Sequence, residues 1–188
     1  MAAPLTKATY SINLGPSDFA ANWTPLMHPG LIAKLIILLA VANGAPLLAK
    51  KMFGARFDRA LDGGTILRDG RPLFGPTKTI RGAAIAVLAT PLAAALMGLQ
   101  WEVGALVAAG AIAGDLFSSF TKRRLGLASS SMAIGLDQIP ESLLPLLASC
   151  ILLPVGWLDI LAGVAIFFVG ELVLSRILFH LNLRDQPY

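Results

Sequence analysis

Long apolar runs separated by short polar segments dominate the pattern of hydrophobic and polar positions in this sequence. Several windows reach about 20 mostly apolar residues, which is the length of a membrane-spanning helix. The predicted spans cover Leu31–Leu48, Gly82–Leu99, Val103–Phe120, Leu143–Val155 with some preceding residues, and Leu158–Phe179. This pattern predicts an all-α integral membrane protein with about five transmembrane helices.

Two of these spans carry further signals. Near the end of the first span, Asn43-Gly44-Ala45-Pro46 combines a polar residue, a flexible residue and a helix breaker. This segment is either a kinked or fraying helix end, or a broken helix that faces a polar cavity and offers Asn43 to a ligand. The third span is rich in glycine and alanine, which predicts close packing against neighbouring helices.

The composition agrees with a membrane location. Of the 188 residues, 56% are hydrophobic and only 14% are charged, which is too apolar for a soluble domain of this size. The single cysteine, Cys150, leaves no disulfide framework and no thiol metal site. We expect one membrane-embedded domain over residues 31–188 and, before it, a loose or interfacial N-terminal arm over residues 1–30. In that arm, His28 is interpreted as a solvated turn residue.

The distribution of charge predicts the orientation in the membrane. Eight Lys or Arg residues lie between spans one and two, three lie between spans three and four, one or two follow span five, and the other two connections hold none. By the positive-inside rule, the N-terminus lies outside the cell membrane, and the basic loops and the C-terminus lie on its cytoplasmic side. Because these cations lie beside apolar spans, an anionic small molecule or lipid headgroup suits them better than nucleic acid.

The polar end of the third span is the strongest candidate for a functional site. Asp115 lies inside this apolar run, and a carboxylate in a membrane segment is costly enough to mark a working site by default. On a helix of 3.6 residues per turn, Ser118, Ser119 and Lys122 lie on the same face as Asp115. A second acid, Asp137, follows a short serine-rich loop.

Two acids with cations close by suggest a metal ion that holds a polyphosphate. Mg²⁺ takes one or two protein carboxylates and completes its shell with phosphate oxygens and water, so Asp115 and Asp137 are the predicted ligands. Lysine and arginine would neutralise the remaining phosphate charge. Two simpler interpretations stay open: Lys122-Arg123-Arg124 as a topological anchor, and Asp115 as a buried partner for one of those cations.

A basic segment, Ala49–Arg81, precedes the second span. Turn signals that contain glycine flank Thr65-Ile66-Leu67, and we predict a small hairpin there. Gly75-Pro76-Thr77-Lys78-Thr79 then leads directly into the helical run, an arrangement that suits phosphate binding at a helix N-terminus. Lys78 and Arg81, which are three residues apart, are predicted to share a helix face. A plain basic loop beside the membrane is the alternative.

Taken in order along the chain, these motifs resemble the CTP-dependent cytidylyltransferases that act on lipid phosphates, and more closely the CDP-archaeol synthase family. The main motifs are Thr77–Gly82, Gly114-Asp115, Ser119–Arg123 and Leu136–Gln138, with support from Ala42–Pro46, Leu61–Gly64, Asp69–Arg71, Phe74-Gly75 and the C-terminal Leu183–Tyr188. The resemblance covers roughly residues 31–188 and leaves the N-terminal arm outside it.

The resemblance implies a five-span membrane enzyme of phospholipid biosynthesis that transfers CMP from CTP to a lipid phosphate and releases pyrophosphate. It implies that Asp115 and Asp137 bind Mg²⁺ and that Lys122 and Arg123 bind the phosphates of CTP. Lys78 with Arg81 would hold the triphosphate or the lipid phosphate. The predicted catalytic set is Asp115, Asp137, Lys122 and Lys78, and the predicted substrate-binding set is Arg123, Arg81, Thr77, Thr79, Ser119 and Asn43.

The sequence departs from the related CDP-diacylglycerol synthases before its second acid. Those enzymes carry a longer segment with glycine and histidine there, whereas Leu127–Leu136 is short and serine-rich, which favours the archaeol-type branch. Pro140-Glu141 and the long N-terminal arm are not typical of that branch, so both the CDP-archaeol and the CDP-diacylglycerol type stay open. Two alternatives of other classes are a small membrane transporter or channel and a noncatalytic membrane subunit that binds anionic lipid. The sequence does not determine the oligomeric state.

Overall fold

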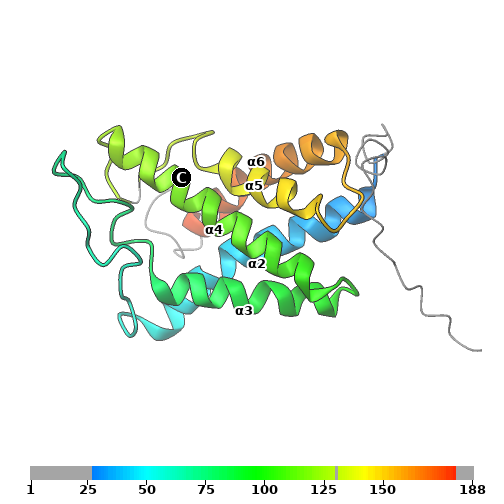
Figure 1. Cartoon of the computed structure of the whole chain (residues 1–188), viewed down its shortest axis with the longest axis horizontal. Helices are drawn as coiled ribbons and strands as arrows, with labels where there is room; N and C mark the ends of the chain where they lie inside the picture. Colours follow the sequence, from blue (N-terminus) through cyan, green and yellow to red (C-terminus); the bar gives the residue numbers. More distant parts are fainter. Residues whose placement is uncertain (1–26, 130, 181–188) are drawn as a thin grey trace, which may run out of the picture.

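The computed structural model describes residues 27–129 and 131–180 as a bundle of five helices (Figure 1). The helices are α2 (Pro29–Phe53), α3 (Ile80–Leu96), α4 (Trp101–Arg124), α5 (Gln138–Ser149) and α6 (Trp157–His180). Within these described ranges no extended strand forms. The prediction of an all-α protein with five apolar helices is therefore confirmed. Most of the predicted arm over residues 1–30, and the C-terminal motif Leu183–Tyr188, lie outside the described residues.

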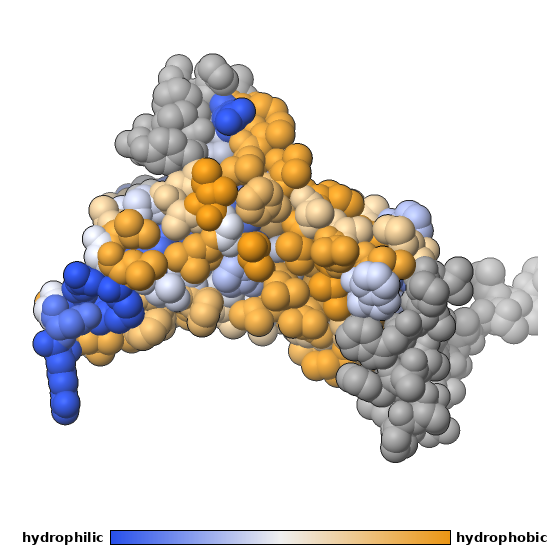
Figure 2. Space-filling view, turned by 90° about the horizontal axis from the view of Figure 1, so that it is seen from above, coloured by the Kyte–Doolittle hydropathy of each residue, from blue (hydrophilic) through white to orange (hydrophobic). Residues whose placement is uncertain are grey.

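Successive helices run in opposite directions, so the connections gather at the two ends of the bundle (Figure 1). α4 contacts α2, α3 and α5, while α6 contacts α2 and α5. The α2–α3 connection, the α4–α5 connection and the end of α6 lie at the same end, which we call the loop end. The segments that carry most of the cations thus share one side of the bundle, as the charge distribution predicts. In Figure 2, apolar side chains cover most of the face in view, and hydrophilic residues gather at the loop end.

Three of the five helices have the length and apolar character of a membrane crossing: α2 with 25 residues, α4 with 24, and Trp157–Ile177 of α6 with 21. α3 has 17 residues and α5 has 12. At a rise of about 1.5 Å per residue, α5 reaches only about 18 Å, which is less than the hydrocarbon core of about 30 Å. The predicted fourth span is therefore a shorter helix followed by turns.

Of the two interpretations of the end of the first span, the broken helix is wrong, because α2 runs unbroken from Pro29 to Phe53 with Pro46 inside it. Proline removes one backbone donor from the helix, and membrane helices tolerate this when neighbouring groups compensate. α3 lies beside the proline: a Cβ placed on Gly82 would lie at ordinary contact distance, 3.5 Å, from that of Pro46. Asn43 is thus one residue of a continuous helix, and its side-chain nitrogen is buried without a hydrogen-bond partner among the described residues.

The other end of the bundle is held by His28, which is paired and is not the solvated turn residue that the sequence suggests. Its backbone N–H donates to Oδ1 of Asp159 at 2.8 Å, and its Nδ1 lies 2.9 Å from Oδ2. The backbone N–H of Gly156 donates to the same Oδ2 at 3.0 Å. His28 and Asp159 are 131 positions apart in the sequence, so no local pattern could reveal this contact between the starts of α2 and α6.

The small residues of α4 bring its backbone against both neighbours, as predicted. A Cβ placed on Gly104 would lie 2.5 Å from the Cα of Pro91 in α3, and one placed on Gly110 would lie 2.5 Å from the Cα of Pro145 in α5. A Cβ placed on Gly114 would lie 2.2 Å from the carbonyl oxygen of Pro140. Real Cβ atoms do not approach this closely, so glycine is required at these crossings.

We predict that Gly114→Ala pushes α5 away from α4. The change should lower the free energy of unfolding by about 1–3 kcal/mol, as overpacking does, and the melting temperature of the detergent-solubilised protein should fall by several degrees. Gly170→Ala is the matched control, because Gly170 lies in a helix and a Cβ placed there would have no atom within 4 Å. Equal melting temperatures for the two variants would contradict the close crossing.

Candidate active site

The buried polar face of α4 lies near the loop end of the bundle. Ser118, Ser119 and Lys122 are 1%, 3% and 9% exposed, although they belong to an apolar helix. Asp115, one turn before them, is partly buried. The predicted face of α4 therefore exists and is turned inward. Charges placed there need partners, because an unpaired buried charge is strongly unfavourable.

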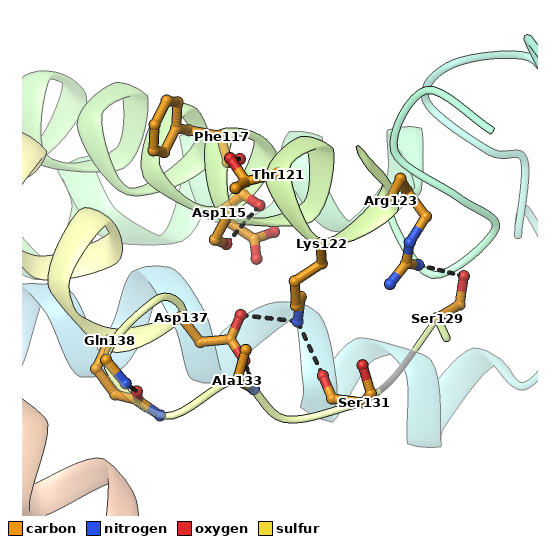
Figure 3. Close-up of polar contacts among 12 residues, drawn as sticks. Asp115, Phe117, Thr121, Lys122, Arg123, Ser129, Ser131, Ala133, Asp137 and Gln138 are labelled. Atoms are coloured by element: carbon orange, nitrogen blue, oxygen red, sulfur yellow. Dashed lines mark hydrogen bonds and ion pairs between the residues drawn. The ribbon is translucent and has the colours of Figure 1, made fainter. Parts of the chain in front are cut away.

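Lys122 finds its partner in Asp137. The two side chains are 11% and 12% exposed, and Nζ lies 2.7 Å from Oδ1 of Asp137. Nζ also donates to the backbone carbonyl of Ser131 at 3.0 Å, so the lysine lies between the serine-rich loop and the start of α5 (Figure 3). The other oxygen of Asp137 accepts the N–H of Ala133 at 2.9 Å. The two predicted residues are thus brought together across 15 positions of sequence.

Asp115 pairs with Lys78, the lysine of the segment that precedes α3. α3 begins only at Ile80, and the side chain of Thr79 caps it by accepting the N–H of Gly82 at 3.1 Å. Lys78 therefore precedes the helix and is free to turn towards α4. Thr77 beside it is exposed.

Arg81 points elsewhere, so the prediction that it shares a helix face with Lys78 is wrong. Its guanidinium group lies 3.1 Å from Oδ1 of Asp58 and donates to the carbonyl of Gly54 at 2.9 Å and to that of Arg56. The physical reason is the position of the helix start: a face shared at three-residue spacing exists only when both residues are helical. Arg81 holds the turn after α2.

The three consecutive cations at the end of α4 bind three different partners. Arg123 is 4% exposed and donates to Oγ of Ser129 at 2.6 Å and to the carbonyl of Ala128 at 2.7 Å (Figure 3). Arg124 pairs with Asp69 at 2.5 Å, and its guanidinium lies 5.4 Å from the centre of the Phe120 ring. Lys122 alone among the three contacts an acid inside the bundle.

The α2–α3 loop is locked onto the end of α4. The predicted hairpin is present as a single bridge between Ile66 and Pro72. At its tip, Arg71 donates to the backbone carbonyl of Arg124. Gly75, with φ of +99°, lies so close to the loop after α4 that a Cβ there would be 2.7 Å from Oγ of Ser129. The loops on either side of the site therefore form one unit.

Asp62 organises the segment that presents Lys78. Its carboxylate accepts the backbone N–H groups of Gly64, Phe74 and Gly75 at 3.0, 2.9 and 3.0 Å. Partial burial raises the pKa of Asp62, but these N–H groups stabilise the charged form more strongly and hold the pKa below its usual 3.8. Asp62 is therefore ionised at neutral pH. It closes the loop at Gly75, which is three residues before Lys78.

One acid of the site was not predicted from the sequence. Glu141 lies on α5 where that helix crosses α4, with its Cα 2.8 Å from a Cβ placed on Gly114. Its carboxyl group lies near that of Asp115, and also near Lys78 and Glu171. The sequence signal was only an acid beside a proline ahead of an apolar run. Within the described ranges, no three His, Cys, Asp or Glu residues cluster tightly enough to hold a metal ion by themselves.

Comparisons with known proteins identify the family of this chain. Residues 100–188 match the family model described as CarS-like CDP-archaeol synthase. The chain is 35% identical to a CDP-archaeol synthase of Aeropyrum pernix, covering 91% of this chain and 98% of that one. It is 32% identical to the CDP-archaeol synthase of Sulfurisphaera tokodaii, covering 87% and 99% of the two chains.

A solved structure is also similar. It is an intramembrane enzyme for archaeal membrane lipid biosynthesis, with a TM-score of 0.62 and 33% identity, covering 76% of this chain and 90% of that one. The fold and these relatives thus identify a membrane-embedded nucleotidyltransferase. The chain belongs to the CDP-archaeol synthase family.

We predict that Asp62→Ala loosens the α2–α3 loop without unfolding the bundle. Losing the common acceptor of three N–H groups should speed trypsin cleavage after the exposed Arg68, while the melting temperature of the helices stays near that of the wild type. Glu102→Ala, at the other end of α4, is the control. Cleavage at the wild-type rate would show that Asp62 does not hold this loop.

Proposed function

We propose that the polar cluster of Asp115, Lys78, Lys122 and Asp137 is the site where this enzyme transfers CMP from CTP to a lipid phosphate. The observation that carries the proposal is the pairing of each acid with a lysine at the loop end of a membrane bundle. Two carboxylates and two ammonium groups are the chemical equipment for a divalent metal and a polyphosphate. Arg123, Ser119, Thr77 and Thr79 lie on the same segments.

The ion pairs suit this ligand because they can exchange partners. Without ligand, Lys78 neutralises Asp115 and Lys122 neutralises Asp137. When CTP and a divalent cation bind together, the lysines can turn to phosphate oxygens while the acids turn to the cation. Every buried charge then has a partner both before and after binding, so the desolvation penalty is not left uncompensated at either stage.

The residues present fit a magnesium ion. Mg²⁺ is usually held by one or two carboxylates and by substrate phosphates. Asp115 and Glu141 lie close together, and two neighbouring carboxyl groups are stabilised by a shared proton or a shared cation. We assign Asp115 and Asp137 as the groups that would hold it together with substrate phosphates, and Glu141 lies beside Asp115. The bound ion would neutralise the charge that develops on the transferring phosphate.

The protein's contribution to the reaction is positioning and charge neutralisation. An oxygen of the lipid phosphate attacks the α-phosphorus of CTP and forms a new P–O–P linkage, and the bond from the α-phosphorus to the β-phosphate oxygen breaks to release pyrophosphate. Such a transfer needs aligned reactants and fixed positive charge more than a side-chain nucleophile. Lys78 and Lys122 can supply that charge from the two sides of the site, the first from the α2–α3 loop and the second from α4.

We further propose an archaeol-type lipid phosphate as the substrate and a cytoplasmic location for the site. The relatives named above are CDP-archaeol synthases and match the chain over most of its length. The cation-rich connections lie at one end of the bundle, as the positive-inside rule expects of a cytoplasmic face. Membership in a family of enzymes argues against the transporter and the noncatalytic subunit.

We predict that Asp115→Asn and Asp137→Asn each reduce product formation by roughly 10²-fold or more, the loss typical of removing one charge-stabilising group. The assay would supply CTP labelled at its α-phosphate, Mg²⁺ and either an archaeol-type or a diacyl lipid phosphate to the purified protein. Glu102→Gln is the matched control, because Glu102 is exposed at the far end of α4. Undiminished CDP-lipid from both variants would overturn the assignment, and product from the diacyl substrate alone would overturn the proposed lipid class.

We also predict that Mg²⁺ and CTP stabilise the protein cooperatively. Since either ligand alone leaves lysines or carboxylates without partners, the two together should raise the melting temperature by more than the sum of their separate effects. The shift is measured without lipid phosphate, and CMP with Mg²⁺ is the control because it lacks the β- and γ-phosphates. Strictly additive shifts would contradict the exchange of partners.

A further inference from the structure

A second candidate binding site lies outside the polar cluster, at the junction of α2, the turn that follows it, and α3. An open cavity of about 400 Å³ occurs here, within the range of about 300–1,000 Å³ that is usual for ligand pockets. Most of its lining is apolar: Phe53, Phe57, Ile80, Ala84 and Ile85. None of the residues that line it comes from α4, α5 or α6, so it is separate from the site of the acids.

The turn that forms one wall of this cavity is firmly built. Arg81 donates to the carbonyl oxygens of Gly54 and Arg56 and pairs with Asp58. Phe57 inside the turn has φ of +59°, a left-handed conformation that is unfavourable for a bulky residue and persists only where surrounding contacts enforce it. The wall is therefore held in place by hydrogen bonds to the start of α3.

The turn presents large apolar side chains outward. Phe53 is 44% exposed and Phe57 is 78% exposed, and both border the cavity. Met52 beside them is 79% exposed. In water, exposing these apolar side chains would be unfavourable. At the edge of a bilayer, the same side chains contact hydrocarbon.

The cations around the cavity have no acidic partner of their own. Lys50, Lys51, Arg56 and Arg59 are exposed and form no ion pair among the described residues, while Asp58 is already engaged by Arg81. Arg59 also lines the cavity. Clusters of four or more cations directly beyond a membrane helix attract anionic lipid headgroups. Cations alone would be a topological anchor, but here Arg59 lines an apolar cavity of ligand size, and the other three lie close to its lining residues in the sequence.

We propose that this cavity binds an anionic phospholipid of the surrounding bilayer, with a hydrocarbon chain against Phe53, Phe57 and Ile85 and the phosphate on Arg59 and its neighbouring cations. This lipid is not the substrate. The turn is tied to the segment that carries Lys78, because the N–H of Leu61 donates to the carbonyl of Lys78 at 2.7 Å. A bound lipid therefore braces the loop that presents Lys78.

The test uses phosphatidylglycerol as the anionic probe and phosphatidylcholine as the neutral one, each titrated into detergent micelles that contain the full chain. Phosphatidylglycerol is a phosphodiester without the terminal phosphate that CMP transfer requires, so its effect is read as a melting temperature and not as activity. We expect it to raise the melting temperature of the wild type more than phosphatidylcholine does, and to do so equally in Asp115→Asn.

Two variants locate the effect. Arg59→Gln should remove most of the difference between the two lipids, whereas Arg68→Gln, which removes another exposed cation of the same loop that does not line the cavity, should leave it unchanged. Ala84→Phe, which fills the cavity without changing charge, should also remove it. Equal shifts with both lipids, equal losses in Arg59→Gln and Arg68→Gln, or a wild-type response in Ala84→Phe would each overturn the proposal. Loss of the shift in Asp115→Asn would place the lipid in the polar cluster instead.

Discussion

The close crossing of α4 and α5 determines where the charged groups of the site can lie. Gly110 and Gly114 are one turn apart on α4, and at both positions the backbone of α5 occupies the space of a side chain. At this distance, Asp137 at the start of α5 reaches Lys122, and Glu141 one turn later reaches Asp115. A wider crossing would break both contacts, because the short side chains of aspartate and glutamate could not span the larger distance between the helices. The acids are therefore positioned by glycines that carry no chemistry themselves.

Burial makes the pairing of these charges obligatory. Lys122 and Asp137 are each about one-tenth exposed, and removing one partner of such a pair typically costs about 3–5 kcal/mol. The ligand-free enzyme therefore holds its cationic and anionic groups together in the site, facing one another. A ligand that is both cationic and anionic, such as a metal polyphosphate, can replace these internal pairs one for one. A ligand of a single charge sign cannot, so the partner exchange that we propose would give the site a physical basis for selectivity.

Much of the fold followed from the sequence because apolar length is a strong and local signal. The five helices, the inward face of α4 and the basic loop end were predictable from run length, helical period and charge count. The contact of Lys78 with α4 was not, because it depends on the start of α3 at Ile80, and helix boundaries are the least reliable feature of a sequence pattern. Glu141 and the pair of His28 with Asp159 depend on contacts between helices, and no spacing along the chain encodes these.

The arginines and lysines of this chain also show why charge count alone could not assign their roles. Lys122, Arg123 and Arg124 are consecutive, yet one enters the bundle, one holds the serine-rich loop and one holds the α2–α3 loop. Successive residues on a helix point about 100° apart. Three consecutive cations therefore extend from the helix in three different directions. Such a run can satisfy the positive-inside rule and supply a buried site at the same time. The topological and the functional interpretations of this motif are therefore compatible, and only the direction of each side chain separates the lysine of the site from its neighbours.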